Sequence, residues 1–176
     1  RLEVKNPGGH SSLPTRDNAI YRLAAGLGRL AAYDFPVSLN EVTRAYFLKM
    51  AAINKGQVAA DMKAVAGNPP DAAAARRLSE SPYYNALLRT TCVATEIEGG
   101  HAINALPQVA RAGVNCRMLP GQSPAEIERT LISTLDDPQI AVSRIGVARP
   151  SPPSPLTPEV IEAVERTTAE VWPGIP

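Results

Sequence analysis

Three polar residues of the 176-residue chain, His10, Asn104 and Arg117, have side chains suited to chemistry. His10 lies in a Gly-Gly-His-Ser-Ser turn, where its imidazole could polarise an oxyanion or hydrogen-bond the start of a helix. Asn104 could donate to a carboxylate, or serve as a turn residue with left-handed geometry. Arg117 could hold a carboxylate with two parallel hydrogen bonds, or form a surface ion pair. Taken singly, none of the three distinguishes a functional role from a structural one.

The elements that carry these residues follow from the hydrophobic pattern. Residues 1–5 alternate between polar and apolar, as a half-buried strand does, and a loop rich in Gly and Pro follows and carries His10. Asp17 is the predicted cap of an amphipathic helix that runs to about Tyr33. Residues 38–89 have a less regular helical pattern, which predicts an insertion of short helices.

The second half of the chain supplies the remaining strands and one more helix. Residues 90–98 suit a strand, and residues 109–118 predict a second strand with Arg117 on its accessible face. A capping box with Pro124 at the first helical position starts a helix, and residues 140–147 form the last predicted strand. The order predicts an α+β fold, a ferredoxin-like two-layer sandwich in which a four-stranded antiparallel sheet has two helices on one face.

The proline content marks the end of this domain. Residues 150–157 read as an extended linker, because four prolines crowd into them, and Thr157 is expected to cap a further helix over 158–171. We therefore predict one domain over 1–149 and a fragment of an adjoining domain over 158–176. The apolar side chains of the final helix need a partner that would lie in that neighbour.

Composition excludes several classes of function. The 18 basic and 17 acidic residues leave no net field to attract nucleic acid, and no stretch approaches the ~20 apolar residues of a membrane span. With two histidines and two cysteines, no complete metal site is expected, and His101 is interpreted as a turn residue. A bridge between Cys92 and Cys116 is conceivable, but free buried thiols are the simpler interpretation.

Four ordered motifs together are far more specific than any of their residues. These are Gly-Gly-His-Ser-Ser-Leu-Pro at 8–14, Leu-Leu-Arg-Thr-Thr-Cys-Val-Ala-Thr at 87–95, Gly-Gly-His-Ala-Ile-Asn-Ala-Leu-Pro at 99–107 and Val-Asn-Cys-Arg-Met-Leu-Pro-Gly at 114–121. They resemble the dimerisation, or lid, domain of the zinc exopeptidase family that includes carboxypeptidase S, glutamate carboxypeptidase, aminoacylase and succinyl-diaminopimelate desuccinylase. The helical insertion is most similar to the carboxypeptidase S branch.

The resemblance implies a role for each of the three polar residues. His10 matches the lid histidine that reaches into the partner subunit's active site and stabilises the oxyanion, and Asn104 and Arg117 match the pair that holds the substrate's terminal carboxylate. Two zinc ions would be bound by a catalytic domain built from sequence outside this chain. A homodimer formed through an exposed strand edge and a helix, acting on small peptides or N-acyl amino acids, is the expected assembly.

Two functional hypotheses follow. The first is the lid of a zinc-dependent metallopeptidase or amidohydrolase, inactive as a separate segment. The alternative is a non-enzymatic ferredoxin-like module for small-ligand binding or assembly, because a fold does not fix a function. An RNA-binding sandwich ranks third, because the predicted strands lack aromatic residues interleaved with Lys or Arg.

Overall fold

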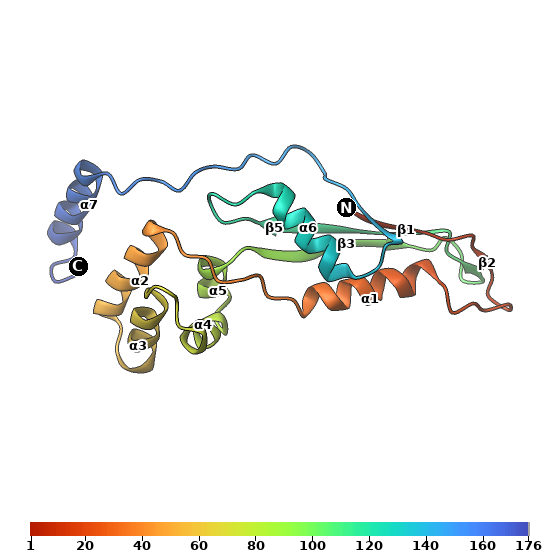
Figure 1. The fold of residues 1–176 in the computed structure, drawn as a ribbon, viewed down its shortest axis with the longest axis horizontal. Helices are drawn as coiled ribbons and strands as arrows, with labels where there is room; N and C mark the ends of the chain where they lie inside the picture. The colour runs from red at the N-terminus through yellow and green to blue at the C-terminus, as the bar shows by residue number, and fades with distance from the viewer. Residues whose placement is uncertain (176) are drawn as a thin grey trace. The chain divides into compact units, whose positions relative to one another are not determined.

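Four antiparallel strands form the main sheet of the computed structural model, which describes residues 1–175 (Figure 1). The strands are β1 (Leu2–Lys5), β3 (Thr91–Gly99), β5 (Val109–Arg117) and β6 (Ile140–Val142). Their order across the sheet is β3-β5-β1-β6. Helices α1 (Ala19–Ala31) and α6 (Pro124–Leu135) pack on one face, so the predicted ferredoxin-like sandwich is confirmed.

Strand alternation decides which side chains enter the core. Leu2 and Val4 of β1 and Ala110 and Ala112 of β5 are almost fully buried under Leu23 of α1. The residues between them point to the opposite face of the sheet, where the Arg111 guanidinium donates to the Glu3 carboxylate at 2.6 Å. By the same alternation, Arg117 lies on the accessible face.

The caps of the two helices differ from the prediction. The cap of α1 is Asn18 and not Asp17, because the Asn18 side-chain oxygen accepts the Ile20 N–H at 2.8 Å. Pro124 does occupy the first turn of α6, but the Ser123 side chain makes no capping bond, so the predicted capping box is wrong. In its place the Ser123 carbonyl accepts the Glu126 N–H at 3.0 Å.

The last strand is shorter than predicted. β6 pairs with β1 only over Ile140–Val142, and residues 143–147 are not strand. Gly146 has a φ of +72°, a left-handed conformation that takes the backbone out of the extended form. Apolar alternation in 140–147 predicted the strand but carried no information about the pairing partner.

The chain divides into two compact units. The sheet unit comprises residues 1–35, 91–118 and 122–150, and the helical unit comprises residues 36–90, 119–121 and the described residues from 151 onward. The predicted short helices are α2 (Glu41–Ile53), α3 (Gly56–Val65), α4 (Ala72–Ser79) and α5 (Pro82–Leu88). They share a core of their own, which includes Phe47, Met62 and Leu88.

The final helix, α7 (Pro158–Val171), has the predicted bounds. None of its residues is buried, and Val160, Val164 and Val171 are exposed along it. Over the described residues, no helix is both long enough and apolar enough to cross a membrane.

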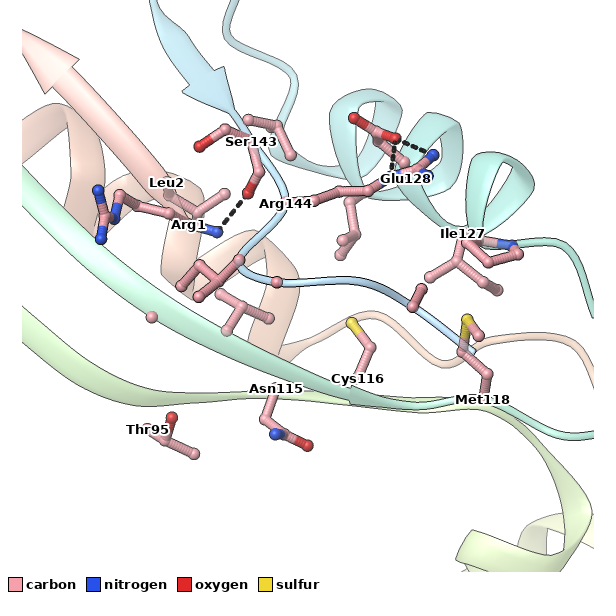
Figure 2. A pocket seen from close by; sticks show the side chains of 18 of the residues that line it. Arg1, Leu2, Thr95, Asn115, Cys116, Met118, Ile127, Glu128, Ser143 and Arg144 are labelled. Carbon is pink, nitrogen blue, oxygen red and sulfur yellow. Dashed lines mark hydrogen bonds and ion pairs between the residues drawn. The ribbon is translucent and has the colours of Figure 1, made fainter. Parts of the chain in front are cut away.

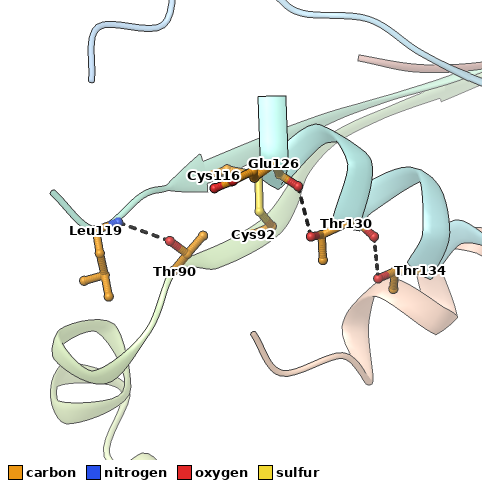
Figure 3. Close-up of a disulfide and its surroundings, with 7 residues drawn as sticks. All are labelled: Thr90, Cys92, Cys116, Leu119, Glu126, Thr130 and Thr134. Carbon is orange, nitrogen blue, oxygen red and sulfur yellow. Dashed lines mark hydrogen bonds between the residues drawn. A yellow bond between two sulfur atoms is a disulfide. The ribbon is translucent and has the colours of Figure 1, made fainter. Parts of the chain in front are cut away.

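Cys92 and Cys116 form a disulfide, so the preferred interpretation of free thiols is wrong (Figure 3). The two residues lie directly opposite each other on β3 and β5, with their Cα atoms 4.1 Å apart. The sequence placed them on neighbouring strands, but it did not set the register that makes them face each other. The bridge fixes the strand end that carries Arg117, the next residue after Cys116.

Removing this bridge should destabilise the chain. The cysteines are 24 residues apart, and closing such a loop in the unfolded state stabilises a fold by about 3 kcal/mol. We expect a reductant to lower the urea midpoint of the wild-type chain and to leave a Cys92→Ser/Cys116→Ser double variant unaffected. Two free thiols in the unreduced wild-type chain would contradict the prediction.

Candidate functional site

A two-stranded ribbon joins the two glycine-rich motifs, although the sequence predicted only loops there. β2 (Gly9–His10) pairs antiparallel with β4 (Ala105–Leu106), with His10 opposite Ala105. The Ser11 N–H then donates to the Asn104 carbonyl at 2.9 Å. The ribbon therefore brings His10 and Asn104 together from distant parts of the chain.

Gly8 allows this close approach. Its φ is +78°, and a Cβ atom added to it would lie 2.6 Å from Gln108 Cγ and 3.2 Å from the Leu106 carbonyl oxygen. Two residues before Gly8, the Asn6 N–H donates to the Gln108 carbonyl at 2.9 Å. Only glycine satisfies both the left-handed backbone and the short distance to the second motif.

A Gly8→Ala substitution should therefore destabilise the ribbon. Left-handed backbone and the displaced Gln108 side chain together should lower the free energy of unfolding by about 1 kcal/mol or more. The matched control is Gly28→Ala in α1, where nothing lies within 4 Å of an added Cβ, and which should be stabilising because alanine favours helix. Equal urea midpoints for Gly8→Ala and the wild type would refute the argument.

The His10 side chain is exposed and contacts its own loop. The Ser12 N–H donates to His10 Nδ1 at 3.2 Å, and the Ser12 hydroxyl oxygen lies 2.8 Å from the same nitrogen. The Leu13 N–H donates to the His10 carbonyl at 3.0 Å and closes the turn. No role was predicted for Ser12, although its position two residues after His10 is the spacing of such a local contact.

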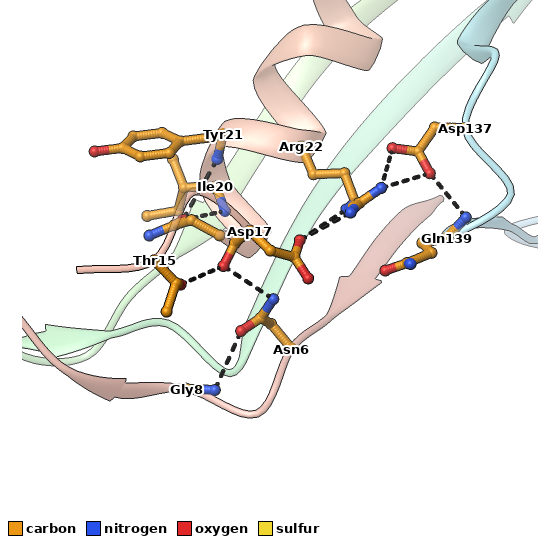
Figure 4. A network of polar contacts seen from close by, with 10 residues as sticks. Asn6, Gly8, Thr15, Asp17, Ile20, Tyr21, Arg22, Asp137 and Gln139 are labelled. Carbon is orange, nitrogen blue, oxygen red and sulfur yellow. Dashed lines mark hydrogen bonds and ion pairs between the residues drawn. The ribbon is translucent and has the colours of Figure 1, made fainter. Parts of the chain in front are cut away.

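A network of ion pairs and hydrogen bonds holds the segment that connects the His10 loop to α1 (Figure 4). The Arg22 guanidinium donates to Asp17 at 2.8 Å and to Asp137 at 2.7 Å, and both the Thr15 hydroxyl and the Asn6 side chain donate to the Asp17 carbonyl. Burial alone would raise the pKa of Asp137, but the Gln139 N–H and the Arg22 guanidinium hold that pKa below its ordinary value. The network fixes both ends of the His10 loop.

Arg117 lies far from His10 and Asn104 within one chain. Arg117 lies opposite Thr91 at one end of β5, whereas the β2–β4 ribbon adjoins the other end, near Val109. At the rise of an extended strand, Val109 and Arg117 are roughly 26 Å apart. The structure thus joins two of the three predicted site residues and separates the third from them.

A groove of about 590 Å³ lies between β5, α6 and residues 142–149, and polar as well as apolar side chains line it (Figure 2). Met118, Ile127 and Leu131 line it, and Arg144 at its rim is paired with Glu128 at 2.6 Å. None of the three predicted site residues lines this groove. Over residues 1–175, no group of three or more His, Cys, Asp and Glu side chains is arranged to hold a metal ion. The residues that the structure describes therefore do not fit a zinc site.

Two solved structures resemble the chain in fold. One is an M20 family metallo-carboxypeptidase from Sulfolobus solfataricus, with 21% identity, a TM-score of 0.46 and coverage of 76% of this chain and 37% of that one. The other is human carnosine dipeptidase 1, with 17% identity, a TM-score of 0.44 and coverage of 77% of this chain and 31% of that one.

Two relatives match nearly the whole chain in sequence. Homo sapiens N-fatty-acyl-amino acid synthase/hydrolase PM20D1 is 27% identical over 99% of this chain and 35% of its own length. Probable carboxypeptidase S-like 2 of Dictyostelium discoideum is 28% identical over 99% of this chain and 33% of its own length. The chain thus spans about a third of these relatives. A family model described as the peptidase dimerisation domain matches residues 1–142, so the chain belongs to the M20 peptidase dimerisation domain family.

Proposed function

We propose that this chain is the lid and dimerisation segment of a zinc-dependent hydrolase that removes C-terminal amino acids or cleaves N-acyl amino acids. The observation that carries the proposal is the ribbon that joins His10 to Asn104, in a chain of the M20 dimerisation family. The names of the two relatives, a probable carboxypeptidase S-like protein and an N-fatty-acyl-amino acid synthase/hydrolase, support this substrate class. In this proposal residues 1–149 are the lid, 150–157 the linker and 158–176 the return into the catalytic domain.

Zinc would be bound by the parent protein outside this chain. The family resemblance implies two ions, and no cluster of ligands within residues 1–175 suits even one. When bound, such ions activate water and polarise the scissile carbonyl. The part of the reaction that belongs to this chain is therefore donation of hydrogen bonds and positioning of substrate.

His10 is proposed to donate to the oxyanion that forms as the amide is attacked. Its ring is exposed on a ribbon that main-chain hydrogen bonds already hold in place. The donor can therefore reach the active site of a partner subunit without a large loss of conformational entropy in the loop. A donor aimed at developing charge in a closed site stabilises the transition state more than the ground state.

Asn104 and Arg117 are proposed to bind the substrate carboxylate, and their separation in one chain requires two copies. A substrate of two residues spans at most about 7 Å, far less than the roughly 26 Å along β5. One copy therefore cannot place both Arg117 and the His10–Asn104 ribbon on the same substrate. We propose that each site takes Arg117 from its own subunit and the ribbon from the partner.

The proposed dimer surface is the free edge of β3 with the adjoining side of α1. β3 is an edge strand of nine residues, and Val93 and Ile97 on it are 57% and 66% exposed. Ile20 of α1 and Ile97 line a shallow hollow of about 250 Å³ beside this edge. A long edge strand with exposed apolar residues favours pairing with a second copy about a two-fold axis.

The decisive experiment compares this chain with its full-length parent, each supplied with zinc. We expect the parent to hydrolyse C-terminal or N-acyl amino acid substrates, and the separate chain to be inert and dimeric by sedimentation. Hydrolysis by the pure separate chain, or a zinc-loaded parent inactive on both substrate types, would overturn the proposal.

A further inference from the structure

We propose that Ser12 is a positioning residue that holds the neutral His10 ring in the tautomer with its proton on Nε2. The inference rests on the proposed role of His10 as an oxyanion donor, but its first test does not. Two contacts carry it, and both involve Nδ1 of the ring.

The main-chain contact favours the lone pair on Nδ1, and the Ser12 hydroxyl adds to the same preference. A backbone N–H can only donate, and the Ser12 N–H points at His10 Nδ1 from 3.2 Å. In this geometry Nδ1 accepts, which favours the neutral tautomer with its proton on Nε2. The other tautomer would set the Nδ1–H against the Ser12 N–H, and the two donors would repel each other.

The Ser12 hydroxyl strengthens the same choice. Its oxygen lies 2.8 Å from Nδ1, within the range of a good hydrogen bond, and its proton can rotate toward the lone pair. The Ser12 N–H and hydroxyl share the one lone pair of Nδ1, and the two contacts also restrain rotation of the ring. The turn closed by the Leu13 N–H on the His10 carbonyl, at 3.0 Å, keeps Ser12 folded back over the ring.

The chemical consequence concerns the outward side of the ring. Nδ1 is occupied within the loop, so Nε2 is the nitrogen left to meet a substrate. With the proton on Nε2 it donates to an oxyanion, whereas an unprotonated Nε2 would present a lone pair and repel negative charge. Ser12 thus makes a loop histidine a donor and not a base toward the substrate.

The first test measures the tautomer directly. In a His101→Gln chain, His10 is the remaining imidazole, and the ring nitrogen chemical shifts of its neutral form report which nitrogen is protonated. We expect Nε2–H in this background, a several-fold larger Nδ1–H population after Ser12→Ala, and return of the Nε2–H form with Ser12→Thr, which keeps the hydroxyl. A proton on Nδ1 before Ser12 is changed, or no change with Ser12→Ala, would overturn the proposal.

The second test uses the zinc-loaded parent. Ser12→Ala should lower kcat about tenfold with KM unchanged, the size expected for losing one hydrogen bond that orients a donor, and Ser12→Thr should restore it. Ser11→Ala is the matched control, because among the described residues the Ser11 side chain has no hydrogen bond to His10.

The two tests separate this inference from the proposed function. A normal kcat in His10→Ala with the expected tautomer shifts would defeat the function of His10 and leave the role of Ser12 on the ring intact. A large loss in His10→Ala with unchanged kcat in Ser12→Ala would overturn the inference about Ser12 alone.

Discussion

Replacing His10 with Ala should lower kcat of the zinc-loaded parent enzyme by about 10²- to 10³-fold, with a much smaller effect on KM. This is the size expected when one preorganised donor is removed from an oxyanion site. The loss should fall on kcat because the donor meets full negative charge only in the transition state. Steady-state kinetics on a C-terminal amino acid or N-acyl amino acid substrate measures both constants.

The second histidine supplies the control for this prediction. His101 is exposed and lies outside the β2–β4 ribbon, so His101→Ala should keep kcat within about twofold, as expected for a surface substitution. Zinc content and dimer formation must be unchanged in both variants, since either could lower the rate for another reason. A normal kcat in a dimeric, zinc-loaded His10→Ala enzyme would show that His10 is not the oxyanion donor.

The hydrophobic periodicity of the sequence predicted the main strands and helices well, because it shows which side chains are buried. The core alternation of β1 and β5 and the apolar stripe of α1 each span several residues and therefore leave a clear pattern. The end of β6 was predicted wrongly, because a strand also needs a partner and the apolar pattern of 140–147 does not contain one. The cap of α1 was assigned to Asp17 and not to Asn18 because local backbone geometry chooses among adjacent cap residues, and the side-chain bond expected of Ser123 depends on a rotamer that the sequence does not give.

The candidate site was harder to predict than the fold. β2 and β4 are two residues each, too short for any periodic signal, and they pair across the chain. The motif resemblance suggested His10, Asn104 and Arg117 but gave no distances between them. The Cys92–Cys116 bridge was missed because it depends on the register between β3 and β5, which a hydrophobic pattern on either strand does not fix.

The separation of Arg117 from the ribbon makes a sharp prediction about mixed dimers. An Arg117→Ala enzyme should be nearly inactive at low substrate concentration, because a guanidinium that holds a carboxylate with two hydrogen bonds is lost. If each site uses Arg117 from its own subunit and His10 from the partner, a heterodimer of His10→Ala and Arg117→Ala subunits retains one intact site. The Arg117 of the first subunit then meets the His10 of the second.

Subunit exchange between these two inactive enzymes should therefore restore activity. A 1:1 mixture that exchanges at random contains half heterodimers, so the expected recovery is roughly one quarter of the wild-type rate. Differently tagged subunits, purified through both tags, would raise the expected value to about one half, as one of two symmetric sites works.

The informative control pairs His10→Ala with Asn104→Ala. These residues sit on one ribbon, where the Ser11 N–H donates to the Asn104 carbonyl, and so they serve the same site. Each site of that heterodimer lacks one of the two groups, and mixing should restore nothing. Recovery in this control, or none with Arg117→Ala in purified heterodimers, would contradict the shared site. The activity of these two mixed dimers therefore tests whether Arg117 and the ribbon of one subunit are too far apart to serve the same site.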